Sequence, residues 1–164
     1  MSILHRALWD KMLGNDEEIH YEFSIGRKYR MFKIYSFLLI LLVSSSVLLV
    51  LFGFANIIVL AMIGVLVLFF LFELFYYGFY VPRANAYVLT NKRIIIHRGW
   101  LSTHTISIDY NKITDMSVAQ SFFDRVVTDS GSIRINTAGT GEHEIILNHI
   151  QTPYEVKKKL DEFF

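Results

Sequence analysis

The sequence has no cysteine, only two prolines and few charged residues. The absence of cysteine excludes a disulfide-stabilised domain, a thiol nucleophile and a cysteine-ligated zinc site. Charged residues make up 19% of the chain, whereas an average soluble domain has about 25%. The deficit is local, because residues 34–81 contain a single charged side chain, Glu73. A charged domain is therefore joined to a long apolar segment, which excludes a soluble monomer, a disordered chain and a fibrous repeat.

The remaining charges give no sign of a catalytic, metal or nucleic-acid site. The net charge is only +1, so we expect no nucleic-acid partner. His97 and His104 flank Gly99 and could face each other across a hairpin, but a metal site needs several converging ligands. Residues 139–141 contain two glycines but lack the strand–loop–helix context and the lysine of a phosphate-binding loop. Residues 130–132 contain serine and glycine but lack the Gly-x-Ser-x-Gly motif of a hydrolase. We predict no enzyme activity, no metal and no cofactor.

The apolar segment has the length of two membrane spans. One spanning helix needs about 20 apolar residues. Gly53 and Asn56 favour a turn near the middle of residues 34–81. We therefore predict transmembrane helices at about 34–53 and 57–80. A cleaved signal peptide is not expected, because the apolar run begins late and is far too long.

Basic residues flank this predicted hairpin on both sides. Arg27, Lys28, Arg30 and Lys33 precede it, and Arg83 is the first of several that follow. The turn between the helices has no charge. Because basic residues remain in the cytoplasm, we predict that both termini are cytoplasmic. The tyrosines near the same end form a predicted aromatic belt: Tyr35, Tyr76, Tyr77 and Tyr80.

The polar residues inside the segment leave two questions open. Ser44, Ser45 and Ser46 fall at the predicted depth of Gly64, where they would either allow close helix packing or be merely tolerated. Glu73 falls at a shallow depth. It either reaches the interface as an ordinary carboxylate or is the working residue of a small transporter or permeation subunit.

Residues 1–33 form a cytoplasmic N-terminal segment. Leu4, Leu8 and Trp9 lie on one side of a helical wheel, so residues 3–13 are predicted to form a short amphipathic helix. Residues 20–25 alternate as in a strand. This strand would either join the sheet of the C-terminal domain or only lead the chain into the membrane.

Residues 82–164 show short alternating runs followed by one helix. We predict strands at 86–90, 93–98, 104–110, 113–118, 132–137 and 144–150, with a bulge in the fourth. Thr152, Pro153 and Glu155 have the spacing of a capping box, and Leu160 lies on the apolar face of the helix that follows. The predicted fold class is α+β: a transmembrane helical hairpin (34–81), then a small antiparallel β-barrel or sandwich capped by a C-terminal helix.

The stretch from Tyr87 to Ser121 resembles the bacterial pleckstrin-homology (PH)-like domain of the membrane-flanked, YdbS-like type. The resemblance rests on a combination: Thr90-Asn91-Lys92-Arg93, an aliphatic strand ending in Arg98-Gly99, an Ile-Thr-Asp step at 113–115, and Pro153 before the last helix. A preceding two-helix hairpin is also typical of the family. The resemblance implies a PH-like barrel without catalytic residues. It suggests a binding or scaffold module in the bacterial inner membrane, in a homo- or hetero-oligomer with another membrane protein carrying PH-like domains.

Two groups of residues are candidates for binding. Lys92, Arg93 and Arg98 could face anionic lipid headgroups or simply belong to the positive flank of the hairpin. A second group is apolar although it falls in loops, which are normally polar: Trp100, Leu101, Phe122 and Phe123. We predict a partner-docking patch there. The alternatives are that Trp100 enters the bilayer interface and that the Phe pair folds under the barrel.

Overall fold

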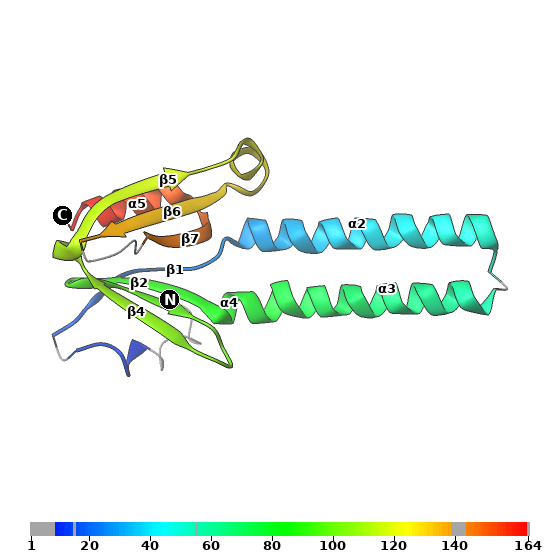
Figure 1. Cartoon of the computed structure of the whole chain (residues 1–164), viewed down its shortest axis with the longest axis horizontal. Helices are drawn as coiled ribbons and strands as arrows, with labels where there is room; N and C mark the ends of the chain where they lie inside the picture. Colours follow the sequence, from blue (N-terminus) through cyan, green and yellow to red (C-terminus); the bar gives the residue numbers. More distant parts are fainter. Residues whose placement is uncertain (1–8, 15, 55, 139–143, 164) are drawn as a thin grey trace.

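The protein is a two-layer β-structure from which a long helical hairpin extends (Figure 1). The computed structural model describes residues 9–14, 16–54, 56–138 and 144–163. Helix α2 (Arg27–Phe52) is the first arm of the hairpin. The second arm begins with α3 (Ile57–Phe75) and continues through the π-helical turn η1 (Tyr76–Tyr80) into α4 (Val81–Ala84).

Both arms are long and apolar enough to cross a membrane, and their side chains are mostly exposed. The turn lies where the sequence predicts it, with Gly53 at a positive φ of 78° and the side chain of Asn56 accepting a hydrogen bond from the Ile58 N–H. The first helix is longer than the predicted span, because α2 begins at Arg27; where the span itself starts stays a prediction. Hydropathy marks only the apolar part of a helix, whereas the Lys and Arg residues before it are also good helix formers.

In the part of the chain that the structure describes, seven strands form two antiparallel sheets. Sheet A has the order β1-β2-β3-β4, and sheet B has the order β5-β6-β7. The strands of sheet A are β1 (Ile19–Phe23), β2 (Asn85–Thr90), β3 (Arg93–Arg98) and β4 (His104–Asp109). The strands of sheet B are β5 (Ile113–Ala119), β6 (Ser130–Thr137) and β7 (Glu144–Gln151). Two short turns interrupt the connections: η2 (Tyr110–Lys112) and η3 (Asp124–Thr128).

The strand before the hairpin pairs with the strand after it. Ile19 lies opposite Thr90, and Phe23 lies opposite Tyr87. The segment around residues 20–25 therefore joins the sheet, which the sequence left open. The division of the chain at residues 33 and 81 stays a prediction, and the β1–β2 pairing unites its first and third parts in one sheet.

The main core lies between the two sheets and is closed at one side by α5 (Pro153–Asp161). Strand residues on the inner faces, such as Leu89, Ile96 and Ile135, are fully buried, as are Val156 and Leu160 of α5. The α+β prediction is confirmed, and so is the bulge near Ile113, where the register of β5 shifts. The two sheets do not close into a barrel. An isolated bridge between Ile25 and Ile150 connects them at one side.

The predicted capping box is wrong. Thr152 precedes α5 at a positive φ of 46°, and among the described residues its side chain makes no capping hydrogen bond. A residue that caps a helix start normally has extended backbone dihedrals, whereas Thr152 is left-handed. Pro153 still occupies the first turn, as predicted.

The outer face of sheet A carries a second, smaller core. Trp9 is fully buried there against Ala86, Val88 and Ile95, and Met12 and Leu13 pack beside it. Strand β2 is therefore covered on both faces. The predicted helix at 3–13 lies largely outside the described residues, but Trp9 is placed as an anchor of the N-terminal segment.

The role of α5 predicts a contrast between two truncations in the same helix. Leu160→Ala removes a fully buried side chain and should lower the free energy of unfolding by about 2–5 kcal/mol. Tyr154→Ala removes a side chain that is 62% exposed and should change it by less than about 0.5 kcal/mol. Thermal unfolding of the detergent-solubilised chain measures both. Equal losses would mean that α5 does not close the core.

Candidate functional site

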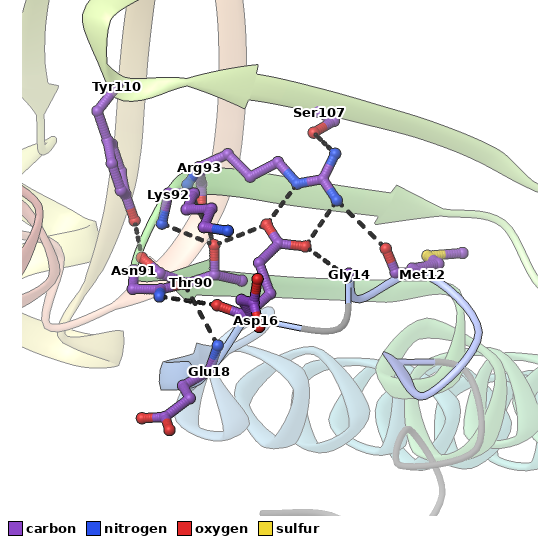
Figure 2. A network of polar contacts seen from close by, with 11 residues as sticks. Met12, Gly14, Asp16, Glu18, Thr90, Asn91, Lys92, Arg93, Ser107 and Tyr110 are labelled. Atoms are coloured by element: carbon purple, nitrogen blue, oxygen red, sulfur yellow. Dashed lines mark hydrogen bonds and ion pairs between the residues drawn. The ribbon is translucent and has the colours of Figure 1, made fainter.

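A network of polar contacts at the end of sheet A surrounds Arg93 (Figure 2). The Arg93 guanidinium donates to both carboxylate oxygens of Glu17, from Nε at 2.6 Å and from Nη2 at 2.7 Å. It also donates to Ser107 Oγ and to the carbonyl of Met12. The Glu17 side chain is only 3% exposed. A two-pronged ion pair of this kind is strong and geometrically specific.

The neighbouring motif residues serve the same network. Thr90 Oγ1 accepts from the backbone N–H groups of Lys92 and Arg93, and the hydroxyl of Tyr110 donates to the Thr90 carbonyl. The Asn91 side chain donates to the carbonyl of Asp16 and accepts from the N–H of Glu18. The Thr-Asn-Lys-Arg motif therefore fastens the N-terminal segment to the β2–β3 turn.

The ion pair alters the acidity of Glu17. The hydrogen bonds from Arg93 lower the pKa of this carboxyl from 4.5 to about 2, although its burial acts in the opposite direction. The hydrogen bonds that Arg93 donates to Glu17 likewise raise the pKa of Arg93. Both groups are therefore charged at neutral pH and engaged with each other.

The three predicted headgroup-binding residues do not form one patch. Lys92 and Arg93 lie at the β2–β3 turn, at the end of β2 opposite to α4, whereas Arg98 lies at the other end of β3, on the α4 side. Arg93 is engaged by Glu17, and Arg98 donates a hydrogen bond to the carbonyl of Ile146. Of these three residues, Lys92 alone is exposed, whereas Arg93 and Arg98 are half-buried.

The second candidate group, the apolar loop residues predicted to dock a partner, lies in two separate turns. Trp100 and Leu101 are exposed in the β3–β4 turn, and the edge of the Trp100 ring lies against Phe79, with centroids 5.7 Å apart. This turn requires glycine at position 99, where φ is 91° and a Cβ would overlap the Ser102 carbonyl. The Gly99 N–H donates to the carbonyl of Ala84, so the turn is held against α4.

The other turn connects β5 and β6. Phe122 and Phe123 are 77% and 68% exposed, and Val126 and Val127 beside them are exposed as well. The expectation that the Phe pair folds under the barrel is therefore wrong. The local turn holds these side chains outward, because Ser121 caps the Asp124 N–H and Thr128 is buried against Ser130.

The polar residues of the hairpin are placed as follows. Ser44 and Ser46 donate hydrogen bonds to carbonyls of their own helix. An added Cβ on Gly64 would meet nothing within 4 Å in the described chain, so α2 does not approach α3 closely at Gly64. Glu73 lies on α3 between Phe69 and Tyr77, whose rings both pack near Phe37. This places Glu73 near the level of Phe37 on α2, and its depth in a membrane stays a prediction.

Where the hairpin meets the sheets there is a cavity of about 330 Å³. Its walls combine tyrosines from the helices with residues of β2, β3 and β7, among them Tyr29, Tyr77, Arg98 and His149. His149 stacks on Tyr29 with ring centroids 3.8 Å apart and has a positive φ of 57°. Burial lowers the pKa of His149, while nearby Asp124 opposes this shift.

A groove of about 220 Å³ runs between β5 and α5. It is lined by residues 113–116 of β5 and by Lys157 and Asp161 of α5. These two helix residues form an ion pair with a nitrogen–oxygen distance of 2.7 Å. β5 is the outer strand of sheet B and pairs with β6 on its other side. A strand edge beside a groove is a geometry that accepts an extended peptide.

The described residues contain no group of three side chains suited to a metal ion. His97 and His104 do not face each other, because His97 lies opposite Thr105 and His104 lies opposite Arg98. Sequence reasoning missed Glu17 and Trp9 as partners of sheet A. The signal available was the run of apolar residues on both faces of β2, which requires a cover on each side.

Comparison with known proteins agrees with this geometry. Residues 36–163 match the family model described as bacterial PH domain. A DUF1696 family protein with a pleckstrin-homology domain from Shewanella loihica PV-4 has a similar solved structure, with a TM-score of 0.50 and 11% sequence identity. The alignment covers 99% of this chain and 98% of that chain. No curated protein sequence matches this chain.

The Glu17–Arg93 pair predicts a pH-dependent stability. Because the pKa of Glu17 is about 2 when folded and 4.5 otherwise, its contribution is complete above pH 4.5 and is lost as the pH falls towards 2. Glu17→Gln should cost about 2 kcal/mol at pH 7, and this difference from the unaltered protein should shrink on acidification. Thermal unfolding at several pH values tests this, with Glu155→Gln as the exposed control. A difference that stays constant down to pH 2 would contradict it.

Proposed function

Because the chain belongs to the bacterial PH domain family, we propose that it is a membrane-anchored binding and scaffold module. It acts at the cytoplasmic face of the bacterial inner membrane and assembles with another membrane protein that carries PH-like domains. Proteins of this family are generally non-catalytic, and the chain needs no cofactor for this role.

Membrane anchoring is supported by the two arms of the hairpin. Each is long and apolar enough to span, and the exposed side chains along them are almost all apolar. Basic residues occur only at the end where the sheets begin, from Arg27 to Lys33 and at Arg83. This asymmetry supports a cytoplasmic location for both termini and for the sheets.

Binding is supported best by the β5 edge and the groove beside α5. In the part of the chain that the structure describes, no strand pairs with the outer side of β5. An edge of this kind can pair with an added strand, and the groove can take side chains of that strand. We assign this edge to an extended segment of the partner protein.

Two other functions have less support. A small transporter or permeation subunit would depend on Glu73, which is alone and shallow. Recognition of anionic headgroups by Lys92, Arg93 and Arg98 conflicts with the engagement of Arg93 by Glu17 and with the position of Lys92 in the β2–β3 turn, at the end of β2 opposite to α4.

The topology can be tested with reporter fusions after Asn56 and after Phe164. We expect an alkaline phosphatase reporter to be active only after Asn56, and a fluorescent protein that folds in the cytoplasm to be active after Phe164. An extracytoplasmic C-terminus would overturn both the orientation and the cytoplasmic role.

The proposed docking edge can be tested by photo-crosslinking in native membranes. A photoreactive residue at Asp115, which is exposed and lines the groove, should give a discrete protein adduct, and one at Glu155 should not. Asp115→Arg should then abolish recovery of that same protein with the intact chain, whereas Glu155→Arg, with the same change of charge, should leave it. Equal recovery with both variants would exclude the β5 edge as the docking site.

A further inference from the structure

The turn between β5 and β6 presents an apolar surface that no described part of the chain covers. We call Phe122, Phe123, Val126 and Val127 the η3 tip; their exposed fractions are 77%, 68%, 65% and 41%. Loop tips of a domain surrounded by water are normally polar, and grouped apolar exposure marks an interaction surface.

The outward orientation of the η3 tip is built into its fold. Thr128 anchors the turn from within, since it is buried and its hydroxyl lies 2.6 Å from Ser130 Oγ. Ser121 Oγ accepts from the Asp124 N–H and also donates to the Asp124 carboxylate at 2.6 Å. This segment therefore presents its apolar side chains and keeps its acid paired locally.

The η3 tip lies beside the beginning of α2 (Figure 1). Lys28 of α2 forms an ion pair with Asp129, the residue that ends η3, at 3.3 Å. Lys28 precedes Ile34, where the uncharged segment starts, by six residues, or about 9 Å along the helix. The headgroup layer is roughly 5–8 Å thick on each side of a bilayer, so aromatic side chains at this level can reach it.

The Trp100–Leu101 turn occupies the corresponding position beside the other arm. It is held to α4 through the Gly99–Ala84 hydrogen bond, and the Trp100 ring lies against Phe79 and Tyr80. Leu101 is 86% exposed. The two apolar points thus stand on either side of the hairpin, at the end of the domain from which the helices leave (Figure 1).

The surroundings favour lipid as the occupant. Trp and Tyr are the residues that prefer the membrane–water interface, and Trp100 here joins Tyr76 and Tyr80 of the belt. Exposed cations accompany the η3 tip, namely Arg27, Lys28 and Arg125, and these attract anionic headgroups. A protein docked on these tips would itself have to lie against the bilayer.

We propose that the η3 tip and the Trp100–Leu101 turn insert into the headgroup–acyl boundary of the cytoplasmic leaflet. These two contacts with the bilayer, one on either side of the hairpin, then hold the sheets at a fixed height above the membrane and at a fixed tilt to it. This inference rests on the proposed membrane anchoring. It assigns to lipid the residues that the sequence assigns to a protein partner, and it leaves the β5 edge facing the cytoplasm for docking.

The absence of cysteine allows a direct test with single nitroxide labels. The full chain is reconstituted in vesicles of phosphatidylethanolamine and phosphatidylglycerol, with one label at Val126→Cys, Leu101→Cys, Val47→Cys or Lys92→Cys. Collision rates with oxygen, which concentrates in lipid, and with a water-soluble nickel complex give the environment of each label. Val126, Leu101, Val47 and Lys92 lie at the surface, with Val126 65% exposed, so the labels should leave the fold intact; thermal unfolding checks this.

We expect the oxygen-to-nickel ratio at Val126→Cys and Leu101→Cys to be several-fold higher than at Lys92→Cys and below that at Val47→Cys. If Val47→Cys reports lipid while Val126→Cys and Leu101→Cys match Lys92→Cys, the inference fails and the anchoring stands. If Val47→Cys also reports water, the anchoring itself fails. Protection of Val126→Cys from both reagents that disappears on dilution into excess lipid would show a protein contact at the tip instead, which also overturns the inference.

Discussion

The pairing of β1 with β2 is the constraint on which the rest of the structure depends. β1 ends four residues before α2 begins, and β2 starts at the residue after α4. Neighbouring strands lie about 5 Å apart, so their pairing holds together the start of α2 and the end of α4, where the hairpin joins the sheet. The hairpin is therefore fixed to sheet A by strands at both ends, which makes it an integral part of the fold.

Because the hairpin is attached through β1 and β2, both faces of β2 need a cover. With β1 and β3 as neighbours, β2 is an inner strand, and its residues are buried on both faces. The inner face packs on sheet B and α5, and the outer face needs a separate cover, which Trp9 and its neighbours provide. The Glu17–Arg93 ion pair fixes that cover in place. A motif that looks basic in the sequence is thereby used for structure.

The same geometry separates the surfaces that remain for function. The remote end of sheet A is occupied by the polar network around Arg93, and the end near the helices carries the two apolar tips (Figure 1). The β5 edge belongs to the other layer, sheet B, and the groove lies between β5 and α5. The strands of sheet B do not directly follow or precede the helices of the hairpin in the chain. In these proposals, the apolar tips contact lipid and the β5 strand edge binds a peptide segment.

The sequence by itself determined the features that depend on local pattern. Residues 34–81 have the length and apolarity of two helices, and the short β-type runs in β2 to β7 locate each of these strands to within about two residues. The combination around Thr90–Arg93, Arg98–Gly99 and Pro153 indicates the family. These features follow from periodicity and chain chemistry, which neighbouring residues set on their own.

Only the tertiary structure decided which distant residues meet. Whether β1 joins the sheet depends on the hairpin bringing residues 19–23 back beside 85–90, and no local pattern encodes that return. The charge of Arg93 is visible in the sequence, but its engagement by Glu17 requires the N-terminal segment to cross the end of sheet A. Likewise, Phe122 and Phe123 are apolar in any reading, and only the fold decides that they point outward at the level where α2 begins. A side chain's type is local information, whereas its partner is set by the packing of the whole chain.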